Sequence, residues 1–360
     1  MKKLSFLFAI VLLVLVVYSC RKNNPVVTAP GTVYLDLPLV EYRYFDNTSV
    51  SKFIDTLDYK ATLGRVLFYD SHLSLNNAIS CASCHNQALG FADNVAFSVG
   101  WEGRLTKRNS IAISGPSGRL FWDGRESNLR RLAIRPISNH VEMGITDSAD
   151  LINKLASLPY YPSLFLKAFG NGNINIHRAS EAIGIFMESF GISRTKLQDA
   201  QFNASGSSLT AIERQGMDLF DNKYNCGSCH NGGNGGYGGF SAGFRDIGLD
   251  KVYSDDGFGS FSGKSKDIGT FKVPNLRNVA LTAPYMHDGR YKTLRDVLEH
   301  YSHNIQDSPN LDTLLKDNGG HAMRMNISEQ EKDAIIAFLG TLTTTDLTIN
   351  PKFSNPFKTK

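Results

Sequence analysis

The sequence contains the motif Cys-x-x-Cys-His twice, as CASCH at Cys81–His85 and as CGSCH at Cys226–His230. In this motif the two thiols add to the vinyl groups of a haem, and the adjacent histidine ligates the iron. The two copies use every cysteine of the chain except Cys20. Disulfides and zinc are the alternatives, but zinc needs no histidine after each cysteine pair and usually has closer pairs. The motifs therefore predict two covalently bound haem c groups.

The residues around the two motifs also repeat. GRVLF at Gly64–Phe68 precedes the first motif, and GMDLF at Gly216–Phe220 precedes the second. An asparagine follows each motif histidine, at Asn86 and at Asn231. A repeat of this kind indicates two related structural units. We expect each unit to be one cytochrome c-like lobe around one haem.

Helix signals are frequent and strand-like alternation is scarce. Thr210 with Glu213, and Ser328 with Glu331, have the spacing of capping boxes, and the second opens a segment with an apolar face at Ile335, Ile336 and Leu339. The glycine-rich segment 232–243 cannot form a stable helix, and predicts either a loop over the second haem or a flexible linker. The predicted fold is mainly α, with two cytochrome c-like lobes, long loops and little β structure.

Composition and charge exclude other classes of protein. The 360 residues are 42% hydrophobic and 20% charged, so a disordered or fibrous chain is excluded. Lysine and arginine total 38 against 34 acidic residues, a net charge of +4 without a concentrated basic block. Nucleic acid is therefore not an expected partner.

The N-terminus has the form of a secretory signal, residues 1–19. Two lysines precede the apolar run Leu4–Tyr18, which is shorter than the roughly 20 residues that a membrane-spanning helix needs. Ser19 before Cys20 resembles a lipobox, although Val17 stands where leucine is usual. We expect a periplasmic lipoprotein anchored through Cys20. The alternative is an ordinary secreted protein with a spare thiol.

Several further stretches carry a resemblance to a known family. They comprise residues 63–70, 73–74, 80–85, 121–125, 142–143, 274–280 and 282–289. In these stretches the chain resembles the bacterial di-haem cytochrome c peroxidase and MauG family, from about Tyr59 to Leu342. The resemblance implies a peroxidatic N-terminal domain at 59–205 and an electron-transfer domain at 206–345. Residues 20–58 are then expected to be a tether and irregular N-terminal arm, and residues 346–360 a loose C-terminal tail.

In the family, peroxide binds at the N-terminal haem, beside a glutamate that follows a proline. Pro136 and Glu142 have that spacing here, so the resemblance makes Glu142 the catalytic acid and base. Cleavage of the O–O bond requires a group that takes a proton from one oxygen and returns it to the other. Burial raises the pKa of a carboxyl group, which allows it both to accept and to return the proton. The alternative is a solvated surface glutamate. Leu132 replaces a glutamine that is common in the family and removes a hydrogen-bonding partner.

Many family members carry a histidine that blocks the first haem iron until the second haem is reduced. The corresponding loop here, Phe97–Arg104, contains no histidine. We therefore expect an open coordination position on the first iron. Trp101 either covers the distal face or simply packs in the loop.

The resemblance leaves the second haem ligand open, since peroxidases of the family use methionine and MauG-type enzymes use tyrosine. Tyr301 is at the matching position of an expected helix from Thr293 to His303, on one face with Leu294, Val297 and Leu298. An inward tyrosine is also compatible with simple core packing. The competing residues are Met286, His287, His300, Met323 and Met325, of which the first two look structural.

Two further site assignments come from the resemblance. Trp122 matches a tryptophan between the two haems and is expected to relay electrons, with interface packing as the alternative. A calcium ion is expected between the lobes, held by the Asn109 side chain and the backbone carbonyls of Thr282 and Pro284. Oxygen ligands of this kind suit Ca²⁺.

Three functions are compatible with these sequence features. The first is a peroxidase that reduces hydrogen peroxide to water with electrons passed from the C-terminal to the N-terminal haem, donated by a small c-type cytochrome or another periplasmic donor. The second is a MauG-like oxidase acting on a protein or a small molecule. The third is a di-haem electron carrier without catalysis, whose irons would both be six-coordinate. Homodimers are common in the family, so a homodimer is a further expectation.

Overall fold

The computed structural model describes residues 33–45, 51–113, 118–192, 194–202, 208–230, 237 and 243–359. The signal, Cys20 and most of the glycine-rich segment lie outside these residues, so those predictions stay untested. The chain divides into a small unit with strands β1 (Val33–Leu35) and β4 (Phe357–Thr359), and a large unit of residues 37–356 that holds the described helices. The two strands are antiparallel, with Val33 opposite Thr359. The units are described separately below.

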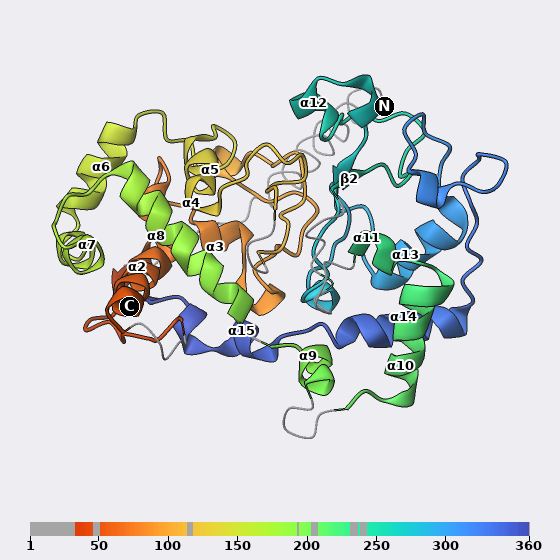
Figure 1. The fold of residues 1–360 in the computed structure, drawn as a ribbon. Helices are drawn as coiled ribbons and strands as arrows, with labels where there is room; N and C mark the ends of the chain where they lie inside the picture. Colours follow the sequence, from red (N-terminus) through yellow and green to blue (C-terminus); the bar gives the residue numbers. More distant parts are fainter. Residues whose placement is uncertain are drawn as a thin grey trace, which may run out of the picture. The chain divides into compact units, whose positions relative to one another are not determined.

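The predicted fold class is confirmed, because the described residues are mainly helical with two short strand pairs (Figure 1). The helices that we call the N-terminal lobe are α2 (Ser51–Tyr69), α3 (Cys81–Cys84), α4 (Leu129–Leu132), α5 (Ile134–Ser138), α6 (Ser148–Ser157), α7 (Tyr161–Phe169), α8 (Ile176–Glu188) and α9 (Lys196–Gln201). Those of the C-terminal lobe are α10 (Ala211–Asp218), α11 (Gly227–His230), α12 (Gly259–Ser262), α13 (Leu294–Glu299) and α14 (Glu329–Gly340). The lobe also contains the antiparallel strands β2 (Phe244–Arg245) and β3 (Phe271–Lys272).

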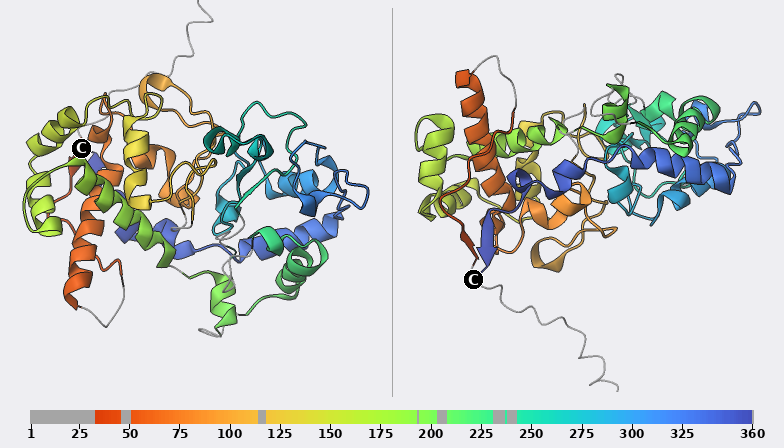
Figure 2. Two further views of the ribbon diagram at one scale, coloured as in Figure 1. Left: turned by 45° about the horizontal axis from the view of Figure 1, so that its top comes forward. Right: turned by 90° about the horizontal axis from the view of Figure 1, so that it is seen from below.

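The sequence repeat corresponds to one packing pattern that occurs in both lobes. In the N-terminal lobe, α2 crosses α8 so closely that a Cβ atom added at Gly64 would lie 2.0 Å from the Ala182 carbonyl oxygen (Figures 1 and 2). In the C-terminal lobe, α10 crosses α14, and a Cβ at Gly216 would lie 1.9 Å from the Ala334 carbonyl oxygen. Only glycine allows backbones to approach in this way. The repeated glycine therefore sets the same helix crossing twice.

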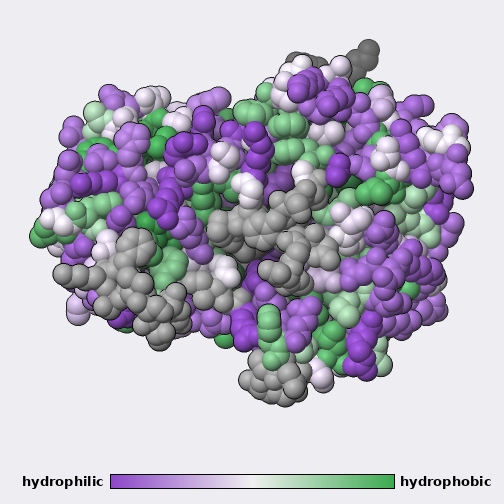
Figure 3. All heavy atoms as spheres, in the orientation of Figure 1, coloured by the Kyte–Doolittle hydropathy of each residue, from purple (hydrophilic) through white to green (hydrophobic). Residues whose placement is uncertain are grey.

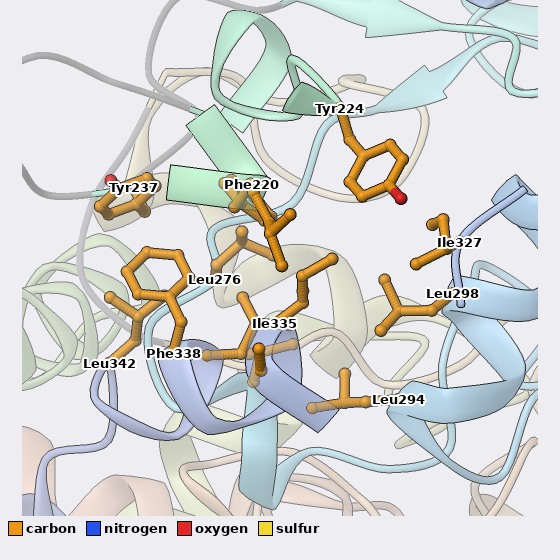
Figure 4. Close-up of a cluster of buried hydrophobic side chains, with 14 of the residues drawn as sticks. Phe220, Tyr224, Tyr237, Leu276, Leu294, Leu298, Ile327, Ile335, Phe338 and Leu342 are labelled. Carbon is orange, nitrogen blue, oxygen red and sulfur yellow. The ribbon is translucent and has the colours of Figure 1, made fainter. Parts of the chain in front are cut away.

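The phenylalanine that ends each repeat packs at the same place beside this crossing. Phe68 contacts Phe186 at 5.5 Å between ring centroids, and Phe220 contacts Phe338 at 5.4 Å. In the C-terminal lobe the core continues through Tyr237, whose ring centroid lies 5.1 Å from that of Phe338 (Figure 4). Both capping boxes predicted from the sequence are present, at the starts of α10 and α14.

Two sequence predictions about the chain ends are wrong. Helix α2 begins at Ser51, so the arm expected to be irregular up to residue 58 is helical in its last part; no proline or glycine interrupts residues 51–63. The expected loose tail is ordered. It contains α15 (Thr345–Ile349) and a 3₁₀ turn (Pro351–Phe353), whose side chains of Leu347 and Phe353 are fully buried. The Tyr69 hydroxyl donates to the Phe353 carbonyl oxygen at 2.6 Å. These contacts join segments that are distant in the sequence, so no local sequence pattern predicts them.

Several large hydrophobic side chains are exposed among the described residues, for example those of Phe202 and Val252. On the face drawn in Figure 3, hydrophobic residues lie between larger hydrophilic areas. Singly exposed apolar side chains are ordinary on folded proteins. Within the described ranges, no helix is both long and apolar enough to cross a membrane.

Candidate functional site

The first cysteine motif forms the short helix α3 and the residue that follows it. His85 lies half-buried with its Nδ1 atom 2.9 Å from the Phe91 carbonyl oxygen. Phe91 is held in turn by stacking on Phe190, with ring centroids 4.0 Å apart. Burial lowers the pKa of the His85 imidazole, so the ring is neutral at pH 7. A neutral imidazole that donates Nδ1–H to a carbonyl presents Nε2 to a metal, as an iron ligand must.

The second motif repeats this arrangement in α11. His230 Nδ1 lies 3.3 Å from the Pro274 carbonyl oxygen, and burial lowers the pKa of this imidazole to about 4. A π-helical turn, η6 (Leu219–Lys223), directly precedes the motif and carries Phe220 into the core. Such turns are frequent at functional sites. Both histidines are therefore prepared in the same way to ligate iron.

The structure does not pair the motif cysteines with one another. All four are free thiols, which removes the disulfide alternative. Throughout the part of the chain that the structure describes, no three His, Cys, Asp or Glu side chains gather closely enough to hold a metal ion. The two cysteine pairs thus form no shared zinc site, whereas covalent haem needs only one motif at a time.

Glu142 is half-buried on the loop after α5 and lies beside the first motif. Its charge contributes to the raised pKa values of both motif thiols, about 12 for Cys81 and about 11 for Cys84, whose main cause is burial. Burial also raises the pKa of the Glu142 carboxyl, and this effect outweighs the opposing charge of Arg125. The Glu142 carboxyl thus lies within electrostatic range of both thiols of the first motif.

Sequence reasoning missed Asn139, which holds the Glu142 side chain. The Asn139 amide donates from Nδ2 to Glu142 Oε1 at 2.8 Å, and its own Oδ1 accepts the Val141 N–H at 2.8 Å. The Asn139 carbonyl oxygen also accepts the Glu142 N–H at 3.1 Å. Asn139 therefore fixes both the side chain and the backbone of Glu142. The available signal was a short amide residue three positions before the glutamate, typical of such turns.

The loop without a histidine packs on the Glu142 loop. The Trp101 N–H donates to the Glu142 carbonyl oxygen at 2.8 Å, and its ring lies against Gly144, whose φ of 75° and lack of Cβ leave the necessary room. The Arg104 guanidinium covers the Trp101 ring at 4.7 Å from its centroid. These contacts give Trp101 a packing role that steadies the backbone beneath Glu142.

Tyr301 lies near the second motif, but not in the expected helix. Helix α13 ends at Glu299, and a π-helical turn, η9 (His300–Asn304), follows it directly. Because a π-helical turn is wider than an α-helical turn, Tyr301 does not keep the α-helical spacing on which the prediction depended. Tyr301 packs, partly buried, against the C-terminal core cluster. Burial raises the pKa of its phenol, and the charges of Cys226 and Cys229 add to this effect. The phenol is therefore within electrostatic range of both thiols of the second motif.

The competing residues differ in their surroundings. His300 places Nε2 2.9 Å from the Ile247 carbonyl oxygen and Nδ1 3.3 Å from the Tyr291 hydroxyl, so both of its ring nitrogens are engaged. His287 stacks on Phe271 with ring centroids 3.7 Å apart. Met325 packs against the same core cluster as Tyr301 and stays a competitor.

Trp122 lies where segments of the two lobes are hydrogen-bonded together. Its indole Nε1 donates to the Asn109 carbonyl oxygen at 3.0 Å, and its own carbonyl oxygen accepts the N–H of Lys272 in β3 at 2.8 Å. Arg108 adds ion pairs to Asp123 at 2.6 Å and to Asp255 at 2.7 Å. Trp122 is thus held by residues from both lobes.

Of the three residues expected to bind calcium, Asn109 is buried beside the loop that carries Thr282 and Pro284. Its backbone N–H donates to the His287 carbonyl oxygen at 2.7 Å, and its side-chain Nδ2 donates to the Val95 carbonyl oxygen at 3.0 Å. Because the amide nitrogen is used, the oxygen Oδ1 is the side-chain atom left for a cation. An oxygen donor in this place fits Ca²⁺.

Two lobes with one packing pattern, each with a Cys-x-x-Cys-His motif, define a di-haem c-type cytochrome. Residues 58–204 match the family model of di-haem cytochrome c peroxidase, and residues 214–343 match the cytochrome c model. The chain is 34% identical to cytochrome c551 peroxidase of Nitrosomonas europaea, over 79% of each chain. It is 33% identical to the methylamine utilization protein MauG of Methylorubrum extorquens, over 79% of this chain and 78% of that protein.

A solved structure shows the same likeness. The crystal structure of a MauG-like protein associated with microbial copper homeostasis superposes with a TM-score of 0.74 and 30% identity, covering 90% of this chain and 99% of that chain. The chain belongs to the di-haem cytochrome c peroxidase family, and two haem c groups are its cofactors.

Proposed function

We propose that the protein is a cytochrome c peroxidase that reduces hydrogen peroxide to water, with electrons that enter at the C-terminal haem and pass to the N-terminal haem. The observation that carries this proposal is the Glu142 carboxyl, which Asn139 orients beside the first haem attachment motif. The names of relatives such as cytochrome c551 peroxidase support it. The haems would be held by Cys81, Cys84 and His85, and by Cys226, Cys229 and His230.

The N-terminal haem, when bound, supplies the iron at which peroxide is reduced. The chain's own residues manage the protons. Glu142 Oε2, the carboxylate oxygen not bonded to Asn139, takes the proton from one peroxide oxygen and returns it to the other, which leaves as water. Its raised pKa makes the return of the proton easier than for a solvated glutamate. Trp122 relays electrons between the two sites from its fixed position on the Asn109 carbonyl.

A second candidate function is favoured by two specific features. Tyr301 near the second motif, and a Phe97–Arg104 loop without histidine, are features of a MauG-like oxidase acting on a protein or small molecule. A non-catalytic electron carrier is the third candidate, and Glu142 at the first site speaks against it.

We expect the fully oxidised protein to bind cyanide and to react with peroxide at once. No histidine of the Phe97–Arg104 loop can occupy the first iron, so its visible spectrum should contain a high-spin band. With a reduced small c-type cytochrome as donor, peroxide should then be consumed in steady-state turnover. A purely low-spin spectrum would favour the electron carrier. Peroxide reactivity without cytochrome turnover would favour the MauG-like oxidase.

We further propose Tyr301 as the distal ligand of the second haem iron. A phenolate stabilises Fe(III), so Tyr301→Phe should change the spectrum of this haem and raise its potential while the ring stays packed. Tyr301→Met should raise the potential and move the behaviour toward a peroxidase of the methionine-ligated kind. The check is a spectroelectrochemical titration of both variants. An unchanged spectrum and potential in Tyr301→Phe would transfer the role to Met286, Met323 or Met325.

The remaining assignments belong to the same proposal. Asn109, Thr282 and Pro284 would hold one Ca²⁺ between the lobes. The boundary between the N-terminal and C-terminal domains would lie at residues 205–206, and a signal would occupy residues 1–19. The protein would work in the periplasm, anchored by a lipid on Cys20, and form a homodimer.

A further inference from the structure

A buried carboxylate at the end of α2 collects two tyrosines and a histidine. Asp70 is only 2% exposed. Its Oδ2 accepts the hydroxyl of Tyr161 at 2.6 Å and that of Tyr160 at 2.9 Å, while its Oδ1 lies 2.6 Å from Nδ1 of His72. We call these four residues the Asp70 cluster. None of them has a part in the peroxide chemistry described above.

The Asp70 cluster contains a proton acceptor and a path to solvent. Burial opposes ionisation of Asp70, but the hydrogen bonds from His72 and Tyr161 outweigh it and lower the carboxyl pKa. The same bond to Asp70 raises the pKa of His72, and the two form an ion pair when the imidazole is protonated. The Asp70 side chain is 2% exposed and the His72 side chain 34%, so His72 connects the buried carboxylate with water.

The cluster lies close to the first haem attachment site. Helix α7, which Tyr161 opens, packs on α2, and α2 also contacts the motif helix α3. The charge of the Cys81 thiol reaches the Tyr161 phenol and contributes to its raised pKa. Beyond Asp70 the chain returns to the peroxide site, where the Leu75 N–H donates to the Met143 carbonyl oxygen at 2.9 Å.

We propose that Tyr161 is a redox-active residue through which oxidising equivalents leave the N-terminal site when no cytochrome donor is bound. This inference rests on the proposed reaction with peroxide, which supplies the oxidant. In the step, the phenol gives one electron to the oxidised N-terminal site, and its O–H bond breaks as the proton moves to Asp70. A neutral tyrosyl radical and a protonated Asp70 result, and His72 releases a proton to water.

Tyr160 extends this route to the surface. Its ring centroid lies 4.7 Å from that of Tyr161, and its hydroxyl bonds to the same carboxylate oxygen. Tyr160 is half-buried, whereas Tyr161 is fully buried. Reduction by a small soluble donor, such as a phenol, would therefore take place at Tyr160 and restore both tyrosines with one electron and one proton.

The test is electron paramagnetic resonance on the oxidised holoprotein, frozen after one equivalent of peroxide without donor. We expect an organic radical signal that narrows when the protein is made with ring-deuterated tyrosine. Tyr161→Phe should lose this signal and keep both haems. Tyr44→Phe is the matched control, since Tyr44 is equally buried in the same lobe but its hydroxyl faces Arg65 and Thr62 and not a carboxylate that could take its proton. It should keep the signal.

The outcomes separate this inference from the proposed function. Unchanged haem bands after peroxide would contradict the peroxidase itself. Changed haem bands with the same radical in wild type and Tyr161→Phe, or with no tyrosyl radical in wild type, would overturn the role of Tyr161. Should Tyr161→Phe fail to bind haem, two other measurements decide. Asp70→Asn should lose the radical signal, because asparagine cannot take the phenol proton. The hyperfine pattern of the wild-type radical should match the ring orientation of the buried Tyr161.

Discussion

Replacing Glu142 by glutamine should lower kcat for peroxide reduction by about 10²–10⁴-fold while both haems stay in place. Glutamine keeps the shape and the hydrogen bond to Asn139, but it cannot carry a proton between the two peroxide oxygens. The measurement is steady-state turnover together with haem content. Glu181→Gln on α8 is the matched control, because Glu181 forms a partly buried ion pair with Lys60, takes no part in the proposed chemistry and should leave kcat unchanged. Unaltered turnover in Glu142→Gln would move the role to another group.

The pH profile adds a second measurement. Glu142 must be deprotonated to take the first proton, so kcat/KM should fall as the pH drops through its pKa. Because burial raises this pKa, the fall should occur above the usual glutamate value of about 4.3. The hydrogen bond from Asn139 favours the carboxylate, so Asn139→Ala should move the fall to higher pH. Glu142→Gln should lack this limb of the profile.

Changing Cys81 and Cys84 to alanine should remove one of the two haems and all reaction with peroxide. Changing Cys226 and Cys229 should also leave one haem, but this variant should still bind cyanide at the first iron and lose turnover with the cytochrome. The difference follows from the separate helices α3 and α11 that carry the two motifs. A pyridine haemochrome assay measures haem per chain. Two haems in either variant would reject the attachment sites.

The retained cyanide reaction also tests the direction of electron flow. If electrons enter at the C-terminal haem, loss of that haem disconnects the donor but spares the peroxide site. Equal cytochrome turnover in the Cys226 and Cys229 variant would show that the donor reaches the N-terminal site directly. This result would leave the Glu142 chemistry intact and change only the proposed route.

The sequence by itself determined the features that depend on consecutive residues. Covalent haem attachment needs five residues in a row, so both motifs could be recognised at Cys81–His85 and Cys226–His230. The helix crossing of each lobe was present as a repeated glycine and phenylalanine, and the capping boxes at Thr210 and Ser328 marked two helix starts that the structure contains. Such signals act within one or two helical turns.

Only the tertiary structure decided which distant residues meet. The Glu142 side chain owes its orientation to Asn139, and its backbone to Trp101 from a separate loop. Phe353, near the C-terminus, is buried among aromatic residues of the N-terminal lobe, although its own segment has no periodic pattern. The Asp70 cluster joins the end of α2 to the start of α7. A hydrogen bond or a ring contact depends on positions in space, and these positions exist only once the helices have packed.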